Sequence, residues 1–101
     1  MTGMAWMYIL ECADGRYYVG STRNIDARVA QHAAGAGSLF TATRLPVKLV
    51  FAAEFENVAE AFAFEKKVQG WSRAKREALI RGDFDALPAL SRSSYRRESG
   101  G

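Results

Sequence analysis

The pattern of hydrophobic positions predicts three strands in this chain. Residues 5–12 are apolar at almost every position, which is typical of a central strand that is covered on both faces. Residues 16–22 are rich in aromatic and β-branched side chains, and the intervening residues 13–15 read as a turn. A third strand is expected over residues 47–55, directly after Pro46. The first two strands should therefore form a hairpin.

Polar capping residues and glycines predict three helices. Asn24 can cap the first helix, and Asn57 with Glu60 forms a variant of the capping box at the start of the second. The helices are expected to run from Ile25 to about Gly35, from Val58 to about Gln69, and from the cap Ser72 to Gly82. Residues 35–44 are expected to form a loop rich in small side chains.

The length of the hairpin loop decides whether two tyrosines can act together. A two-residue turn would place Tyr8 and Tyr18 on opposite faces of the sheet. A three-residue loop, with Gly15 in the left-handed conformation of a G1 bulge, instead pairs Tyr8 with Gly20 and puts both tyrosines on one face. We expect the three-residue loop. Gly20 would then leave open space opposite Tyr8.

Polar residues also occur inside the apolar stripes of the predicted helices. At 100° per residue, His32 lies within about 20° of Ile25 on the first helix, and Arg28 within about 60°. On the second helix, Glu65 lies about 40° from Ala61, in the middle of its apolar stripe. A buried carboxylate is costly unless it is paired, so a compensating cation is expected, either a basic side chain or a metal ion.

Each of these residues also has a purely structural interpretation. A strand tyrosine is usually part of the core, and a buried glutamate is more often salt-bridged than metal-bound, with Arg28 as the obvious partner of Glu65. Convergence favours a functional site, because Tyr, Arg, His and Glu side chains from separate elements are all expected to point toward one side of a small sheet.

Composition restricts the class of protein. The chain of 101 residues has room for one domain, expected over residues 1–90, and its tail 91–101 is expected to be basic and disordered. A single cysteine allows no internal disulfide, and no segment resembles a membrane span or a secretory signal, so a cytoplasmic location is expected. Ten of the fourteen basic residues are arginine and the net charge is +3, which leans mildly toward nucleic acid.

The motifs in their order resemble the GIY-YIG nuclease superfamily. The subgroup is that of small stand-alone domains similar to the N-terminal incision domain of the bacterial nucleotide-excision-repair nuclease. The matching motifs are Met7-Tyr8-Ile9, Tyr18-Val19-Gly20, Asn24-x-x-x-Arg28-x-x-x-His32, and Glu65 in Phe64-Glu65-Lys66-Lys67. The resemblance covers about residues 5–80. Trp6 stands where the first motif has glycine, and Ser21 replaces a lysine of the repair enzyme that is one candidate activator of the base.

The resemblance implies an α+β fold, a three-stranded antiparallel sheet flanked by helices, and metal-dependent hydrolysis of DNA, with a role in DNA repair or processing. Glu65 would bind Mg²⁺ or Mn²⁺, Arg28 would clamp a phosphate oxygen, and a tyrosine would accept a proton from the attacking water. Arg28, the metal or a charged His32 could lower the pKa of that tyrosine, or His32 could relay the proton as a neutral ring. Which tyrosine is the base stays open. The residues expected to contact the DNA are Gly20, Asn24, Lys66 and Lys67.

Two other functions are compatible with the same residues. One is a nucleic-acid-binding module without catalysis, which loss of Glu65 or Arg28 would favour, and both are present. The other is a protein-interaction domain with a structural network of polar side chains. DNA, including branched or damaged DNA, is the expected partner of the nuclease and of the binding module. Because the chain is short, sequence specificity is expected to be low, structure-directed or supplied by a protein partner.

Overall fold

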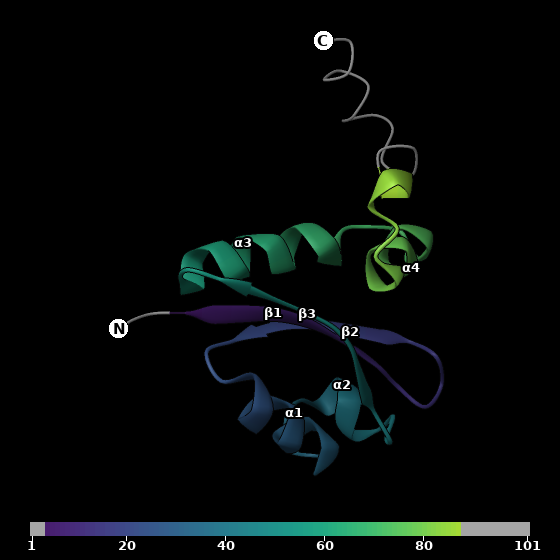
Figure 1. The fold of residues 1–101 in the computed structure, drawn as a ribbon. Helices are drawn as coiled ribbons and strands as arrows, with labels where there is room; N and C mark the ends of the chain where they lie inside the picture. Colours follow the sequence, from purple (N-terminus) through teal and green to yellow (C-terminus); the bar gives the residue numbers. More distant parts are fainter. Residues whose placement is uncertain (1–3, 88–101) are drawn as a thin grey trace, which may run out of the picture. The chain divides into compact units, whose positions relative to one another are not determined.

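A computed structural model describes residues 4–87 (Figure 1). The chain divides into two compact units, at Gln69 and Gly70. The expected disordered tail, residues 91–101, lies outside the described residues. The elements of the first unit are β1 (Ala5–Glu11), β2 (Tyr17–Thr22), α1 (Ile25–Ala33), α2 (Leu39–Ala42), β3 (Lys48–Phe55) and α3 (Val58–Gln69). The second unit contains α4 (Arg73–Arg81) and the 3₁₀ helix η1 (Phe84–Ala86).

The three strands form one antiparallel sheet with the order β2-β1-β3. The predicted α+β class is confirmed, and the strand expected to be central is central. β1 is buried on both faces because α1 and α2 cover one side of the sheet and α3 covers the other (Figure 1). Met7 and Ile9, both fully buried, each gain about 1.5–3 kcal/mol from this burial.

The hairpin has the predicted three-residue loop. The Cys12 N–H donates to the Arg16 carbonyl at 2.8 Å, and Gly15 has a φ of 87°, in the left-handed region. Tyr8 therefore pairs with Gly20, and Leu10 pairs with Tyr18. Since alternate residues of a strand share a face, Tyr8 and Tyr18 lie on the same side of the sheet.

Capping contacts explain where the helices begin. The Asn24 side chain accepts from the Ala27 N–H at 3.1 Å at the start of α1, and the Asn57 side chain accepts from the Glu60 N–H at 2.9 Å at the start of α3. Ser72 caps α4, which ends at Gly82 in the left-handed conformation. The expected loop over 35–44 is partly wrong, because it contains the four-residue helix α2.

Candidate active site

Three aromatic rings meet on the face of the sheet that α1 covers. The Tyr8 and Tyr18 ring centroids are 6.3 Å apart, and the His32 ring lies 5.8 Å from Tyr8 and 4.9 Å from Tyr18. Tyr8 Oη and His32 Nε2 form a hydrogen bond of 2.9 Å. The Tyr8 and His32 side chains are buried, whereas Tyr18 is half-buried. A phenol on strand β1 is thus hydrogen-bonded directly to an imidazole on helix α1.

Gly20 allows this cluster to form. A Cβ at this position would lie 2.6 Å from Tyr8 Oη and 3.1 Å from Cε2 of Tyr18, both closer than ordinary contact. The expectation that Gly20 leaves open space is therefore wrong, because the Tyr8 hydroxyl occupies that space. The glycine instead brings the phenol hydroxyl against the backbone of the edge strand β2.

Arg28 lies one helical turn before His32 and is half-buried. Its guanidinium donates to the Gln31 side chain at 2.9 Å and to the Gly37 carbonyl at 3.2 Å. Its positive charge also lowers the pKa of Tyr8. Arg28 is therefore held by α1 and the loop that follows it, rather than by Glu65.

Burial dominates the electrostatics of the phenol. It raises the pKa of Tyr8, and this effect outweighs that of Arg28, which lowers the same pKa. Tyr18 and Glu65 raise it further through their charges. Arg28 thus acts on the pKa of Tyr8 in the expected direction, but burial of the phenol raises the pKa by more. Tyr8 remains a neutral phenol at neutral pH.

His32 is neutral as well. Burial is the larger cause, and the charge of Arg28 the second, of a pKa that lies below the ordinary value for histidine. A charged His32 is therefore disfavoured, whereas the alternative of a neutral ring that accepts a proton agrees with the structure. Nδ1 of the ring is hydrogen-bonded to Thr41 Oγ1 at 2.9 Å.

Glu65 reaches the site from the opposite face. It lies on α3, whereas Arg28 and His32 lie on α1, on the other side of the sheet (Figure 1). The expectation that all these side chains point toward one side is wrong, because a helical wheel gives the inward stripe of a helix but not the sheet face on which the helix packs. Glu65 nevertheless influences Tyr8 electrostatically across β2.

The carboxylate of Glu65 is held by two neutral donors. Ser21 Oγ donates to Oε1 at 2.6 Å, and Gln69 Nε2 donates to Oε2 at 2.7 Å. These bonds account for a carboxylate that is only 9% exposed and that has no basic partner among residues 4–87, where one was expected. Neither of the two donors carries a positive charge. A divalent cation that prefers oxygen ligands is compatible with such a group.

The four residues expected to contact DNA have different surroundings. Asn24 is occupied as the cap of α1, which is a structural role, and Gly20 accommodates Tyr8. Lys66 and Lys67 are exposed on α3, directly after Glu65, and the Lys66 ammonium lies 4.9 Å from the ring centre of Phe62. The two lysines are therefore the exposed cationic side chains of this set, and they suit contact with phosphate.

Sequence reasoning missed the residues that support the site. Ser21 and Gln69 hold Glu65, and Gln69 follows it at the i, i+4 spacing that brings two helical side chains together. Gly37 and Thr41 lie in the segment expected to be a loop, where they contact Arg28 and His32. One indication of Thr41 lies in the sequence, since an inward-facing histidine needs hydrogen-bond partners for both ring nitrogens.

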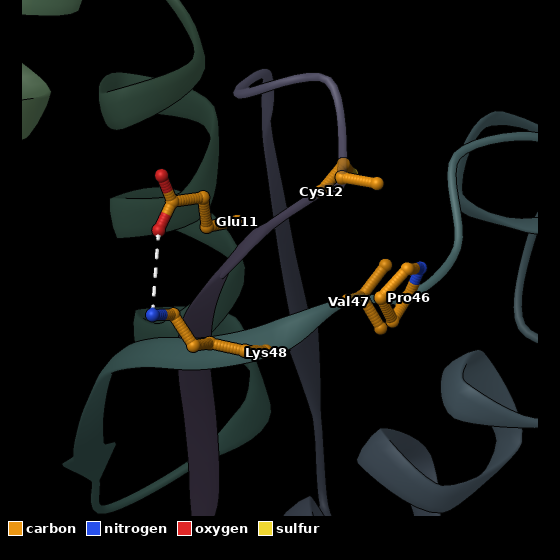
Figure 2. Close-up of a pocket in the computed structure, with 6 residues that line it drawn as sticks. Glu11, Cys12, Pro46, Val47 and Lys48 are labelled. Carbon is orange, nitrogen blue, oxygen red and sulfur yellow. Dashed lines mark ion pairs between the residues drawn. The ribbon is translucent and has the colours of Figure 1, made fainter.

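The described residues of the first unit line at least two hollows. The larger, about 320 Å³, contains none of the candidate site residues and lies beside the Glu11–Lys48 ion pair of 3.9 Å (Figure 2). The smaller, about 200 Å³, includes Ser21, the residue that donates to Glu65. Its other lining residues are Ala5, Thr22, Arg23, Val58 and Ala61. We therefore place the chemistry at the edge strand β2 rather than in the larger hollow.

Two features are absent from the described part of the chain. Within residues 4–87, no three His, Cys, Asp or Glu side chains cluster closely enough to enclose a metal ion. None of the helices in this range has the length and apolar character needed to cross a bilayer.

Comparison with known proteins places these residues in a wider group. Residues 4–78 match the family model described as the GIY-YIG catalytic domain. A UPF0213 protein from Streptococcus pneumoniae is 39% identical over 84% of this chain and 86% of its own length. Another from Halobacterium salinarum is 42% identical over 76% of this chain and its full length.

A solved structure is also similar. It is the solution NMR structure of a UPF0213 protein from Bacillus halodurans, with 40% sequence identity and a TM-score of 0.51. The match covers 77% of this chain and 83% of that one. The similarity therefore extends over most of both proteins in sequence and in fold.

Proposed function

Because the chain belongs to the GIY-YIG nuclease superfamily, we propose that it is a metal-dependent endonuclease that hydrolyses phosphodiester bonds of DNA in repair or processing. The observation that carries the proposal is the hydrogen-bonded arrangement at Tyr8. Its hydroxyl is hydrogen-bonded to the imidazole of His32 beside the edge strand β2, and the carboxylate of Glu65 lies on the other side of the same strand.

Glu65 is the residue that would hold Mg²⁺ or Mn²⁺. One carboxylate, completed by water and phosphate oxygens, is a usual arrangement for a hard cation that acts on phosphate groups. The bound ion would supply positive charge that offsets the negative charge of the phosphate and the leaving oxygen. Ser21 and Gln69 fix the orientation of the carboxylate and leave it charged.

Arg28 is suited to bind the scissile phosphate. A guanidinium has five N–H donors, which is more than its contacts with Gln31 and Gly37 require. These contacts hold it in place, so little side-chain entropy is lost when a phosphate binds. Charge-assisted hydrogen bonds from this group would stabilise the negative charge that develops on the phosphate in the transition state.

Tyr8 and His32 provide a path for the proton of the attacking water. The Tyr8 oxygen accepts a proton from water while its own proton moves along the 2.9 Å hydrogen bond to His32 Nε2. The phenol stays neutral before and after the step, so its raised pKa is no obstacle. We therefore assign the proton transfer to Tyr8, which bonds to the imidazole, and the positioning of the water or phosphate to Tyr18, which is half-buried beside it.

The test is incubation of the protein with branched, nicked and duplex DNA, with Mn²⁺ or Mg²⁺ and with a chelator. We expect metal-dependent cleavage, and lower activity on intact duplex than on branched or nicked DNA. Absence of cleavage with either metal, together with salt-sensitive binding of the same DNA, would support a binding module instead.

A further inference from the structure

The short segment from Gly37 to Thr41 encloses the His32 ring on the side opposite Tyr8. A Cβ at Gly37 would collide with Nδ1 and Cγ of the imidazole, so the ring lies directly against the backbone there. Thr41 is fully buried in α2, and its hydroxyl is the partner of Nδ1 at 2.9 Å. Both ring nitrogens therefore have a defined partner, and the question is which nitrogen carries the proton.

The hydroxyl of Thr41 has three neighbours, which constrain its single proton. Its oxygen lies 3.3 Å from the Ser38 carbonyl, 3.0 Å from Ser38 Oγ and 2.9 Å from Nδ1 of His32. A carbonyl only accepts, so that contact uses the Thr41 proton. The two lone pairs of the oxygen then accept from Ser38 Oγ and from a protonated Nδ1. All three contacts are satisfied only in this arrangement.

A second proton count, at Tyr8, gives the same answer. Among the described residues, the hydrogen bond of the Tyr8 hydroxyl is the one to His32 Nε2, at 2.9 Å. If Nε2 donated this bond, the buried Tyr8 proton would have no acceptor among the described residues. If Nε2 is unprotonated, it accepts the Tyr8 proton at 2.9 Å and every group is satisfied.

From these two counts we infer that Thr41 is a positioning residue, which holds His32 in the Nδ1-protonated tautomer so that Nε2 accepts the proton of Tyr8. The tautomer is a property of the protein without DNA. Its consequence for cleavage rests on the proposed function, because only that tautomer leaves His32 able to receive the proton that Tyr8 passes on.

The tautomer can be read directly, because His32 is the only histidine in the sequence. In nitrogen-15-labelled protein, long-range proton–nitrogen correlation spectra of the imidazole distinguish protonated from unprotonated nitrogens. At neutral pH we expect a protonated Nδ1 and an unprotonated Nε2. An Nε2-protonated ring in the wild-type protein would overturn the inference, whatever the protein does to DNA.

Variants of Thr41 test the cause. Thr41→Val has nearly the same shape but no hydroxyl, so the ring should shift toward the Nε2-protonated tautomer, and Thr41→Ser should restore the wild-type spectrum. Thr43→Val is the matched control, since Thr43 is exposed in the same segment and bonds to the Leu39 and Phe40 carbonyls. An unchanged tautomer in Thr41→Val would overturn the role of Thr41. If this variant fails to fold, Thr41→Ser and the wild-type spectrum still decide.

Cleavage provides the second readout. Thr41→Val should lower the cleavage rate about 10²-fold, within the range that a proton-transferring group contributes, with unchanged DNA affinity. Thr41→Ser and Thr43→Val should cut at close to the wild-type rate. Wild-type cleavage by a Thr41→Val protein whose tautomer has shifted would refute the relay. A wild-type protein that cuts no DNA but shows the expected tautomer would refute only the proposed function.

Discussion

If a methyl group is added at Gly20, the side chain that should be displaced most is that of Tyr8. In Gly20→Ala the new Cβ would lie 2.6 Å from Oη and 2.8 Å from Cζ of Tyr8, whereas ordinary contacts of carbon are about 3.5–4.0 Å. The phenol must therefore move by about 1 Å. Tyr8 is only 1% exposed and is packed against Tyr18 and His32, so this movement strains the core and weakens its hydrogen bond to His32.

Overpacking of this kind costs about 1–3 kcal/mol in the free energy of unfolding. Gly15→Ala is a control of similar size and different cause. Gly15 has a φ of 87° and nothing within 4 Å of a Cβ, so alanine there costs about 1–2 kcal/mol through the backbone alone. The two variants should be destabilised to a comparable extent, but only Gly20→Ala should displace the Tyr8 hydroxyl from its position in the site.

Urea unfolding followed by circular dichroism measures the stability, and initial rates on nicked or branched DNA measure the activity. We expect both variants to lose stability, and the activity of Gly20→Ala to fall at least about tenfold below that of Gly15→Ala, because displacement of about 1 Å is enough to impair proton transfer. Equal activity in the two folded variants would refute the idea that the position of the Tyr8 hydroxyl matters.

Three further predictions concern single charged or titrating groups. Glu65→Gln should retain the fold and DNA binding but lose most cleavage in Mg²⁺, whereas Glu60→Gln, exposed on the same helix, should cut normally. Arg28→Lys should cut at least about tenfold more slowly with little change in DNA affinity or its salt dependence, and parallel losses of stability and cleavage would indicate a structural role. Because the folded pKa of His32 is lowered, the stability contributed by the neutral ring is present above its unfolded pKa of about 6.5 and is lost as pH falls below it. Urea midpoints should decrease over that range, and a His32→Gln variant should show a smaller decrease.

Local chemistry was enough to predict the hairpin and the helix ends. The loop length followed from Gly15, and with it the pairing of Tyr8 with Gly20, because a strand has only two faces and one residue of slip exchanges them. The caps at Asn24 and Asn57 fixed the starts of two helices in the same way. These features depend on neighbours within a few positions in the sequence.

The support of the site depends on contacts between distant segments, and the sequence did not reveal it. Helix α2 has four residues, too few for a periodic pattern to indicate it. Ser21 contacts Glu65 across 44 positions, and the importance of Thr41 emerges only when the His32 ring is placed beside it. Helical periodicity also could not assign α3 to the face opposite α1, because both faces of a small sheet need covering.

The placement of Glu65 on one face and His32 on the other makes the candidate site depend on the folding of the whole first unit. The half proposed to bind a metal ion requires α3 on the sheet, and the half proposed to accept the proton requires α1 and α2 on the opposite side. If either helical layer detaches in a local opening, one half of the candidate site is lost. A newly made or partly unfolded chain would therefore lack the proposed cleavage activity until both helical layers have packed on the sheet.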